Sequence, residues 1–414
     1  MNKDDLIQLG KQAQQASFTI SNLGTKQKND ILLAFADALE QQTAAVLAAN
    51  EKDLANSAVE ARFIDRLTLD EGRIEGMATG LRKLVGLKDP IAEIDGGWET
   101  ESGLRVIKQR VPLGVVGMIY EARPNVTIDA AGLCFKAGNA VILRGGRESL
   151  HSNLQLAMIL RTVLEQHHLD PNIIQIIDDP SHELAQQFME LTEYVDVLIP
   201  RGSARLIQTV VKHASVPVIE TGAGNCHIYV DQAAEEQMAT DIIINGKVQR
   251  PSVCNSTEKV LIHQAVAKHM LPGIIATLRD NGVEVRGDDA TRQIVSDVIP
   301  ANPEDWDTEY NALVIAIKVV DSEEAAIRHI NQHGTHHSEV IVSDNYQAGV
   351  QFQKQVDAAC VYVNASSRFT DGFEFGFGAE IGISTQKLHA RGPMGLRALT
   401  SYKYVINGNG QVRK

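Results

Sequence analysis

A single thiol near the middle of the chain is the residue best suited to covalent chemistry. Cys254 lies in residues 248–257 among small and polar neighbours, which let a substrate approach the sulfur. A helix end or a cation close to such a thiol can lower its pKa and raise its nucleophilicity. The alternative is a buried cysteine without a chemical role, since free cysteines are among the most buried residue types. Cys254 is therefore a candidate nucleophile, and its surroundings must decide between the two roles.

Two turns that follow predicted strands supply candidate anion sites. One contains Arg-Gly-Gly-Arg-Glu-Ser from Arg144, the other Pro-Arg-Gly-Ser-Ala-Arg with Gly202 and Ser203, and each opens a predicted helix. Free N–H groups at a helix start, with arginine nearby, suit a phosphate or pyrophosphate. Arg144 is a candidate for the 2′-phosphate of NADP; exposed arginines and ordinary helix capping are the alternatives. Two such turns in one half of the chain favour a dinucleotide ligand.

Two further turns carry polar side chains suited to catalysis or binding. Asn125 can donate an amide N–H to a developing oxyanion, and Arg123 beside it can hold a carboxylate or phosphate. Glu220 is a candidate general base or polar anchor, and Gly222 would let a ligand approach the backbone. The alternatives are a polar turn for the first pair and a solvated strand-end carboxylate for Glu220.

Two polar stretches late in the chain are dense in hydrogen-bond donors. Residues 364–369 include Arg368, and residues 386–391 include Arg391. Arginine suits the recognition of carboxylates and phosphates. A polar surface loop is the alternative for both stretches. The three phenylalanines of residues 373–377, which lie between them, fit such a loop less well.

Composition and charge limit the classes of function. The chain has 414 residues, 44% hydrophobic and 22% charged, which suits a soluble globular protein of two or three domains. It has 39 Lys and Arg against 52 Asp and Glu, for a formal net charge of -13. Non-specific nucleic-acid binding needs a basic surface, so we expect no nucleic-acid partner. An anionic ligand would have to be attracted by local arginines or backbone N–H groups.

Cysteine usage and the lack of long apolar runs point to the cytoplasm. The four cysteines are widely spread, without zinc-ligand spacing, and are too few for a disulfide scaffold. We therefore expect reduced thiols and no bound metal. The acidic N-terminus lacks the form of a signal peptide, and no apolar run approaches transmembrane length, so we expect no membrane partner.

The elements that must position these residues follow an α/β pattern. Residues 1 to about 90 are rich in alanine and lack proline before Pro90, which predicts a scaffold of packed helices. From Val115 onward, short apolar runs alternate with longer helical segments, as in a parallel, doubly wound sheet. A boundary is expected near Glu220, with a second α/β series beyond it. The predicted strands cover residues 115–119, 140–143, 172–177, 195–199 and 216–219, then 227–230, 259–262, 312–320, 340–342 and 361–363.

The order of these motifs resembles the aldehyde dehydrogenase superfamily. A Pro-x-Gly-Val-Val-Gly strand entry is followed by the anion-binding turn, the Gly-Ser helix start, the Glu-x-Gly turn and then Cys254 about 30 residues on. Within that superfamily, residues 120–127, 220–227 and 373–395 most closely resemble the enzymes that reduce L-glutamyl 5-phosphate. The resemblance covers nearly the whole chain. It implies NADPH-dependent formation of L-glutamate 5-semialdehyde and phosphate, through a thioester on Cys254, in proline biosynthesis.

The same resemblance implies domains and partners. Residues 1–96 and 113–220 would form a Rossmann-like cofactor-binding domain and residues 221–397 a catalytic domain. Residues 97–112 and 398–414 would supply the strands of a small β oligomerisation element, so a homo-oligomer is expected. The strand near 400–406 is expected to pair with the one near 104–111, in this chain or a neighbour's. A glutamate kinase is a further expected partner, because it would supply the unstable acyl phosphate.

The carried-over roles are specific to positions. By position, Gly202 and Ser203 would line the nicotinamide side, Arg144 replaces a lysine near the adenosine ribose, and Glu309 would hold the nicotinamide ribose. Arg368 or Arg391 is expected to bind the substrate carboxylate and Arg123 the phosphate, with Glu220 in a secondary role. The superfamily's Trp-Asn motif is absent, and the turn ending at Asn125 takes its place. A backbone N–H at Cys254 or Asn255 is the alternative oxyanion donor.

Two other functions remain alternatives at this point. An aldehyde dehydrogenase that makes acids irreversibly would turn over without phosphate and depend strongly on Glu220. A non-catalytic relative would keep the fold for binding a partner, and its Cys254 would not titrate below an ordinary thiol. Retention of the cysteine, the anion turns and the late polar stretches argues against the non-catalytic alternative.

Overall fold

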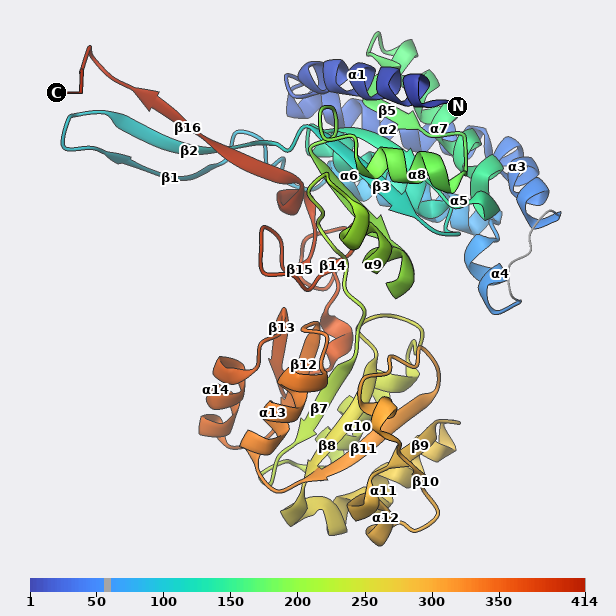
Figure 1. Ribbon diagram of the computed structural model, residues 1–414, viewed down its shortest axis with the longest axis vertical. Helices are drawn as coiled ribbons and strands as arrows, with labels where there is room; N and C mark the ends of the chain where they lie inside the picture. The colour runs from blue at the N-terminus through green and yellow to red at the C-terminus, as the bar shows by residue number, and fades with distance from the viewer. Residues whose placement is uncertain (56–60, 414) are drawn as a thin grey trace. The chain divides into compact units, whose positions relative to one another are not determined.

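The chain forms two compact units (Figure 1). The computed structural model describes residues 1–55 and 61–413. Unit 1 consists of Met1–Thr221, Gly376–Gly382 and Met394–Lys414, and unit 2 of Gly222–Phe375 and Ile383–Pro393. The predicted boundary at 220/221 lies one residue from this division. The sequence predicted that residues up to 397 belong to the second domain, whereas Gly376–Gly382 and the residues from Met394 onward join unit 1. These two segments are tied to each other, because Ile381 N donates to Met394 O and Met394 N donates to Gly382 O.

A four-stranded parallel sheet forms the centre of unit 1. The spatial order of its strands is β5-β4-β3-β6. Two strands extend the sheet on one side of β3 and one strand on the other, which makes a topological switch point beside β3. In such sheets, ligands bind outside the carboxyl ends of the strands at the switch point. The bounds are β3 Val115–Tyr120, β4 Ala140–Arg144, β5 Ile174–Ile176 and β6 Val197–Arg201.

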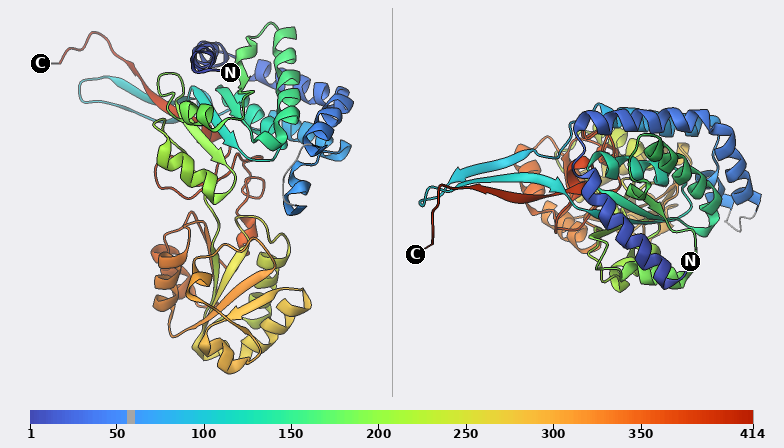
Figure 2. Two further views of the ribbon diagram at one scale, coloured as in Figure 1. Left: turned by 45° about the vertical axis from the view of Figure 1, so that its right-hand side comes forward. Right: turned by 90° about the horizontal axis from the view of Figure 1, so that it is seen from above.

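Helices cover both faces of this sheet (Figure 2). Apolar side chains of α1, α8 and α9 form one core with Val115 and Ile119 of β3. Helices α6 and α7 pack on the other side, and α2, α3 and α5 pack against them. The predicted N-terminal scaffold of helices is confirmed for the described residues. The bounds are α1 Lys3–Ile20, α2 Thr25–Gln41, α3 Thr43–Ala55, α4 Ala61–Leu67, α5 Glu71–Val85, α6 Asn125–Lys136, α7 Leu150–Gln166, α8 His182–Met189 and α9 Ala204–His213, with 3-10 turns at Arg147–Ser149 and Pro171–Ile173.

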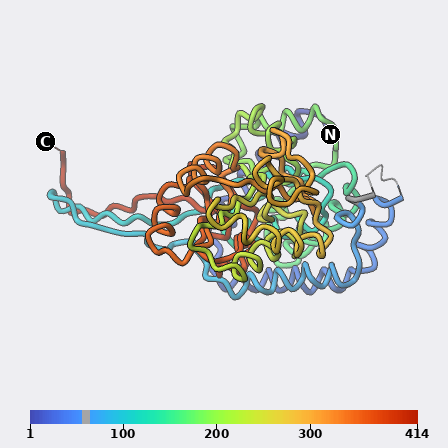
Figure 3. Tube along the Cα trace, turned by 90° about the horizontal axis from the view of Figure 1, so that it is seen from below, coloured from blue at the N-terminus to red at the C-terminus, as the bar shows by residue number. Residues whose placement is uncertain are grey.

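A three-stranded antiparallel arm projects from the body of unit 1 (Figures 1 and 3). Its order is β1 (Ile94–Glu99), β2 (Arg105–Pro112) and β16 (Thr400–Asn407). β16 pairs with β2 of its own chain along eight residues, which settles the pairing between the two predicted strands. β1 runs through Gly96 and Gly97. The register shifts before Gly96, and glycine within a strand is typical of such irregularities.

Unit 2 is built on a seven-stranded parallel sheet. Its order is β10-β9-β11-β8-β7-β12-β13. Strand side chains alternate between two cores: Ile228 and Val230 of β7 face α10 and α11, and Tyr229 faces α13 and α14. The strands are β7 Cys226–Val230, β8 Thr257–His263, β9 Glu284–Gly287, β10 Ile299–Pro300, β11 Val314–Val320, β12 Ser338–Val342 and β13 Cys360–Val363. The helices are α10 Glu236–Val248, α11 Gln264–Asp280, α12 Asp289–Ile294, α13 Glu323–His333 and α14 Tyr346–Gln355.

Short elements complete the two units. In unit 2, β14 and β15 pair antiparallel, and two 3-10 turns precede β11 and follow β13; in unit 1, a 3-10 turn precedes β16. Their bounds are β14 Ile383–Ser384 and β15 Gly392–Pro393, with 3-10 turns at Pro303–Trp306, Ser367–Phe369 and Leu396–Leu399.

The α/β prediction is confirmed by these two parallel sheets, with local differences. Residues 216–219 form no strand but a single bridge between Leu198 and Val218. Helix α6 and the strands β9 and β10 were not predicted, and the two strands are only four and two residues long. No single helix among residues 1–55 and 61–413 is long and apolar enough to span a membrane. Helices α2 and α3, which are bent by 67° relative to each other, have together the length and composition of a membrane span.

Candidate active site

Cys254 lies in the loop that joins α10 to β8 in unit 2. The helix ends at Val248 and the strand begins at Thr257, so the loop sits at the amino ends of the parallel strands. Cys254 is partly exposed, whereas Cys134, Cys226 and Cys360 are buried. Among the four cysteines, Cys254 is therefore the one a substrate can reach.

The backbone of Cys254 is braced by the turn that enters β7. The buried Cys226 thiol donates a hydrogen bond to the Cys254 carbonyl oxygen, with the sulfur 3.2 Å from that oxygen. Gly224 packs so closely on the same carbonyl that a Cβ there would overlap its oxygen. Only glycine fits at position 224 while the Cys254 backbone keeps this position.

Arg368 reaches the same loop from the 3-10 turn after β13. Its Nε donates to Gln249 Oε1 at 3.0 Å, and its Nη1 donates to Asn255 Oδ1. Burial lowers the pKa of the Arg368 guanidinium, Arg250 lowers it further, and the negative charge of an ionised Cys254 opposes both effects. The structure therefore brings the predicted nucleophile and one of the two predicted carboxylate-binding arginines into one neighbourhood.

Asn255 ties the Cys254 loop to the segment that carries Arg368. Its Nδ2 donates to Thr370 O at 2.8 Å, and its carbonyl accepts from the Ser367 hydroxyl at 2.7 Å. The side chain is buried, so these hydrogen bonds are shielded from water. Asn255 is consequently held through both its side chain and its main-chain carbonyl.

Glu309 is held on the same side of unit 2. Its Oε1 accepts a hydrogen bond from Gly224 N at 2.8 Å, so the loop before β11 meets the turn before β7. The loop is fixed further by Lys259, whose Nζ donates to Thr308 O at 2.7 Å and lies 4.5 Å from the centre of the Tyr310 ring. The assignment of Glu309 to a cofactor ribose stays a prediction.

Buried charges support this loop from the interior. Lys247 and Glu258 form a fully buried ion pair at 3.1 Å, and Lys247 Nζ also donates to Ala312 O. Burial raises the pKa of Glu258 to about 7 and lowers that of Lys259 to about 8. Loss of one partner would leave an uncompensated buried charge, which typically costs about 3–5 kcal/mol. Lys247, Glu258 and Lys259 therefore hold the loop before β11 in place.

Arg391 and Gly222 have other neighbours in unit 2. Arg391 forms an ion pair with Asp357 at 2.7 Å, and Lys387 pairs with the same carboxylate at 2.6 Å. Gly222 N donates to Ile383 O at 2.9 Å, and a Cβ on Gly222 would overlap the side chain of Thr385. Both residues are thus engaged in packing between chain segments, and their ligand roles stay predictions.

Unit 1 gathers its predicted anion groups at the carboxyl ends of β3 and β6. Tyr120 and Arg201 pair at the ends of these strands, beside the switch point. Ser203 caps α9, and both its N–H and its hydroxyl donate to the Glu121 carboxylate, each at 2.7 Å. A Cβ on Gly202 would lie 2.6 Å from the same carboxylate. The start of α9 therefore binds an anion, and Glu121 supplies it.

Asn125 is the first residue of α6 and is exposed. Its Nδ2 donates to Asp129 Oδ2 at 2.9 Å, one helical turn on. Burial raises the pKa of Asp129 to about 6, against the opposing effects of Asn125 and Arg201. Arg123 and Glu220 are half-buried members of unit 1, and Arg123 lies in the turn that leads into α6.

Arg144 ends β4 and turns inward. Its Nη2 donates to Pro180 O at 2.9 Å and Ser181 O at 3.3 Å, and burial lowers its pKa. It thereby holds the segment that leads into α8. Arg147, in the same turn, is exposed. The contact of Arg144 with a 2′-phosphate stays a prediction.

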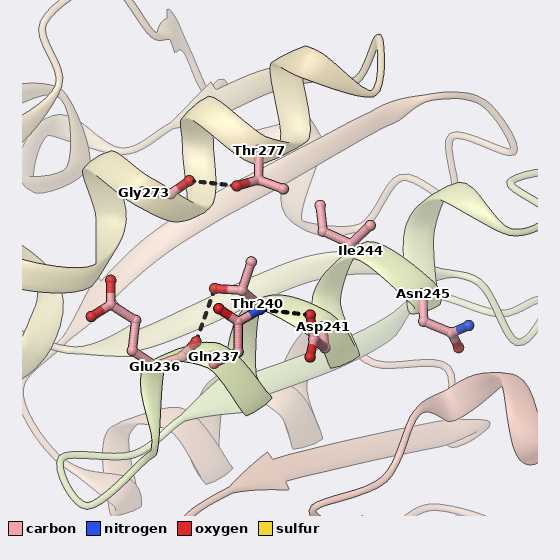
Figure 4. Close-up of a pocket in the computed structure, with 8 residues that line it drawn as sticks. All are labelled: Glu236, Gln237, Thr240, Asp241, Ile244, Asn245, Gly273 and Thr277. Carbon is pink, nitrogen blue, oxygen red and sulfur yellow. Dashed lines mark hydrogen bonds between the residues drawn. The ribbon is translucent and has the colours of Figure 1, made fainter.

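A surface hollow of about 480 Å³ lies elsewhere in unit 2, between α10 and α11 (Figure 4). Three of its polar side chains donate within their own helices: Thr240 to Glu236 O, Gln237 to Asp241, and Thr277 to Gly273 O. The Glu236 carboxylate pairs with His269 of α11 at 3.0 Å. None of the predicted site residues lines it. Among the described residues, no group of three or more His, Cys, Asp or Glu is arranged to hold a metal ion.

Several residues that shape the site were not singled out from the sequence. Asp129 had a usable signal, because side chains four apart on a helix meet and Asn125 opens α6. Glu121 lies in the motif of residues 120–127, yet its contact with Ser203 joins the turns after two strands far apart in sequence. Gly224 and Cys226 lie in the motif of residues 220–227. Their contact with the Cys254 carbonyl depends on the parallel pairing of β7 with β8, which spacing alone does not reveal.

Comparison with known proteins gives consistent matches over the chain. A family model described as "Aldehyde dehydrogenase family" matches residues 1–293. The chain is 66% identical over 409 residues to the gamma-glutamyl phosphate reductase of Lactiplantibacillus plantarum, covering 99% of each chain. It is 58% identical over 416 residues to that of Enterococcus faecalis, covering 100% of each. A crystal structure of gamma-glutamyl phosphate reductase from Thermotoga maritima superposes with a TM-score of 0.97 at 45% identity, over 99% of this chain and 100% of that one.

Proposed function

The chain belongs to the aldehyde dehydrogenase family, among its gamma-glutamyl phosphate reductases, and we propose that it reduces L-glutamyl 5-phosphate to L-glutamate 5-semialdehyde and phosphate with NADPH. The observation that carries this proposal is the partly exposed Cys254, whose loop is fixed by Gly224, Cys226 and Arg368. In this proposal the reaction runs through a thioester on Cys254 and serves proline biosynthesis.

The first half of the proposed reaction transfers the acyl group to sulfur. The Cys254 thiolate attacks the acyl carbon, and a tetrahedral oxyanion forms. Backbone N–H groups of Cys254 or Asn255, or the Asn125 amide, are the proposed donors, each worth roughly 3–4 kcal/mol to such a transition state. The oxyanion collapses with cleavage of the bond from carbon to the phosphate oxygen. Phosphate is a good leaving group, so no strong general acid is required.

The second half returns the thiol. The nicotinamide cofactor, when bound, supplies a hydride to the thioester carbon. Cleavage of the carbon–sulfur bond then releases the aldehyde and regenerates the Cys254 thiolate. Arg368 is the proposed partner of the substrate carboxylate, Arg391 the alternative, and Arg123 the proposed partner of the phosphate. Glu220 has a positioning role rather than the role of a general base. A base there would activate water, and water would hydrolyse the thioester to glutamate.

The start of α9 fits a cofactor phosphate. The Ser203 N–H and hydroxyl already hold a carboxylate at 2.7 Å, so the donors there are arranged for an anion. Gly202 and Ser203 are proposed to bind the cofactor, with Arg144, Glu309 and Gly222 as further contacts. We propose NADPH rather than NADH because Arg144 and Arg147 flank the two glycines of the turn after β4.

The test of the function is oxidation of glutamate semialdehyde, the reverse reaction, with and without phosphate. We expect reduction of NADP that depends on phosphate, since phosphate must take the acyl group from the thioester. With NAD in place of NADP the rate should fall. The measurement is absorbance of the reduced cofactor at matched aldehyde concentrations. Equal rates without phosphate, with glutamate as the product, would instead identify an aldehyde dehydrogenase that makes acids.

A second prediction concerns Glu121, whose carboxylate occupies the donors of Ser203. Any cofactor phosphate that binds these donors must displace it. We expect Glu121→Gln to tighten NADPH binding about five- to tenfold, because an anion at a helix start is worth up to about 1–2 kcal/mol. Fluorescence titration of NADPH measures this directly. Glu183→Gln on α8 is the matched control, with the same loss of charge at an exposed position of unit 1. Unchanged or weaker binding in Glu121→Gln would contradict displacement.

The partners and compartment proposed for the chain follow from the same family membership. The substrate is a small molecule, and a glutamate kinase would supply its acyl phosphate. The arm of β1, β2 and β16 carries exposed apolar side chains that suit association with a second copy, so a homo-oligomer is proposed; they are Ile94, Trp98, Tyr402, Tyr404 and Ile406. A cytoplasmic location fits the four free cysteines.

A further inference from the structure

Cys226 is a buried thiol in direct contact with the backbone of the proposed nucleophile. It begins β7, its side chain is inaccessible to solvent, and its Sγ lies 3.2 Å from the carbonyl oxygen of Cys254. No bond is made or broken at its sulfur in the proposed reaction. The contact joins two residues 28 positions apart in the chain, so it depends on the fold and not on local sequence.

The geometry makes Cys226 a hydrogen-bond donor. Burial raises the pKa of the Cys226 thiol well above its usual range, and the nearby Glu339 adds to the effect, so the sulfur keeps its proton. A thiol has one proton to donate. His337 Nδ1 is the other acceptor in reach, at 3.8 Å, but that nitrogen lies 2.8 Å from the Ser338 hydroxyl. The shorter distance therefore assigns the proton to the Cys254 carbonyl.

Holding the carbonyl of Cys254 also fixes the N–H of the next residue. The peptide bond is planar and trans, so its C=O and N–H point in opposite directions; no cis peptide occurs in the described ranges. With the carbonyl turned toward Cys226 and Gly224, the Asn255 N–H points away from β7. Asn255 cannot readily rotate, because Thr370, Ser367 and Arg368 hold its other polar groups.

We propose that Cys226 is a positioning residue of the reaction: its thiol holds the peptide between Cys254 and Asn255 so that the Asn255 N–H donates to the acyl oxygen when Cys254 is acylated. This inference rests on the proposed function, and it selects one of the backbone donors left open there. Donors fixed before the reaction stabilise developing charge without reorganisation, which is the main source of their effect.

Two pairs of variants separate the hydrogen bond from packing. Cys226→Thr and Cys226→Val fill similar volumes and differ by one hydroxyl donor; Cys226→Ser and Cys226→Ala form a smaller pair. In each pair we expect the hydroxyl variant to keep kcat within about threefold of the parent, and the apolar variant to lose about tenfold or more. KM for glutamyl phosphate should change less than twofold, because the donor acts on the oxyanion rather than on the bound substrate.

The outcomes decide the proposal in either direction. If the hydroxyl variants are no more active than their apolar partners, the hydrogen bond has no role and the proposal is wrong, whether both are active or both are impaired. Should the larger pair fail to fold by circular dichroism, the smaller pair decides. Cys360→Ala, which makes the same change at the first residue of another strand of this sheet, is expected to keep full activity. Full activity in Cys254→Ala would overturn the proposed function itself, independently of Cys226.

Discussion

Replacement of Cys254 by alanine is expected to lower the phosphate-dependent rate by about 10⁴-fold or more while the protein stays folded. Without the sulfur no thioester can form, and no other thiol can take its place, because the other three cysteines are buried. Cys254 is partly exposed in a loop, so its truncation leaves no large cavity. The measurement is the initial rate of cofactor reduction with semialdehyde and phosphate, together with the thermal midpoint of unfolding.

The chemical labelling of Cys254 provides a second measure of the same prediction. Iodoacetamide should modify the parent protein first at Cys254 and inactivate it in proportion, and peptide mass analysis identifies the labelled residue. Cys360→Ala serves as the control, since it removes a thiol from the same unit without touching the loop. A Cys254→Ala protein that still reduces the acyl phosphate at the parent rate is incompatible with a thioester on this residue.

Replacement of Gly224 by alanine is expected to have the second largest effect. A Cβ at this position would overlap the carbonyl oxygen of Cys254, which is backbone and cannot rotate out of the way. The turn or the catalytic loop must therefore shift, and the Gly224 N–H would lose its geometry toward Glu309. We expect activity to fall at least about 100-fold, since a displacement near 1 Å of reacting groups is enough for such a loss, with stability reduced by about 1–3 kcal/mol.

A matched substitution separates this clash from a general effect of adding a methyl group. Gly273 lies within α11, and a Cβ there would meet its nearest neighbour at 3.5 Å, an ordinary contact. Gly273→Ala should therefore keep full activity and unfold at the same temperature or slightly higher, because alanine favours helix over glycine. Parent-like activity in Gly224→Ala would show that the catalytic loop tolerates displacement and is not braced as described.

The sequence predicted the fold of this chain because its two α/β series are regular. The apolar run Val115–Tyr120 became a central strand close to its expected bounds, since a strand covered on both faces is usually apolar. Thr257–His263 also became a central strand, although only its residues 260–262 are apolar. Residues 216–219 were overpredicted, because their apolar residues contribute to the core of unit 1 without extending the sheet beyond one bridge. Helix α6 was not predicted, because the residues that lead into it were interpreted only as a polar turn.

Some residues of the candidate site could be predicted from the sequence, and others depend on contacts that only the structure shows. Cys254 and Ser203 follow from residue type and from their places beside helices and strands. For unit 1, the rule that ligands bind at the carboxyl ends of parallel strands also applies directly to Ser203. In unit 2, Cys254 precedes its strand, as does the turn with Gly224, so the same rule would have directed attention to the opposite edge of the sheet. The bracing of the Cys254 carbonyl and the inward turn of Arg144 depend on contacts distant in sequence.

The arm of unit 1 cannot form until its last strand, β16, has been synthesised. Arg110 of β2 donates to Thr400, the first residue of β16, across 290 residues of chain. At about 5–20 residues per second, β2 would wait roughly 15–60 s on the ribosome for this partner. Until then β2 is an open edge, which invites pairing with other chains. The residues of unit 2 are made during that interval, so β16 can join the arm only after unit 2 has been synthesised. Its open edge is the point most exposed to misassembly in a newly made chain.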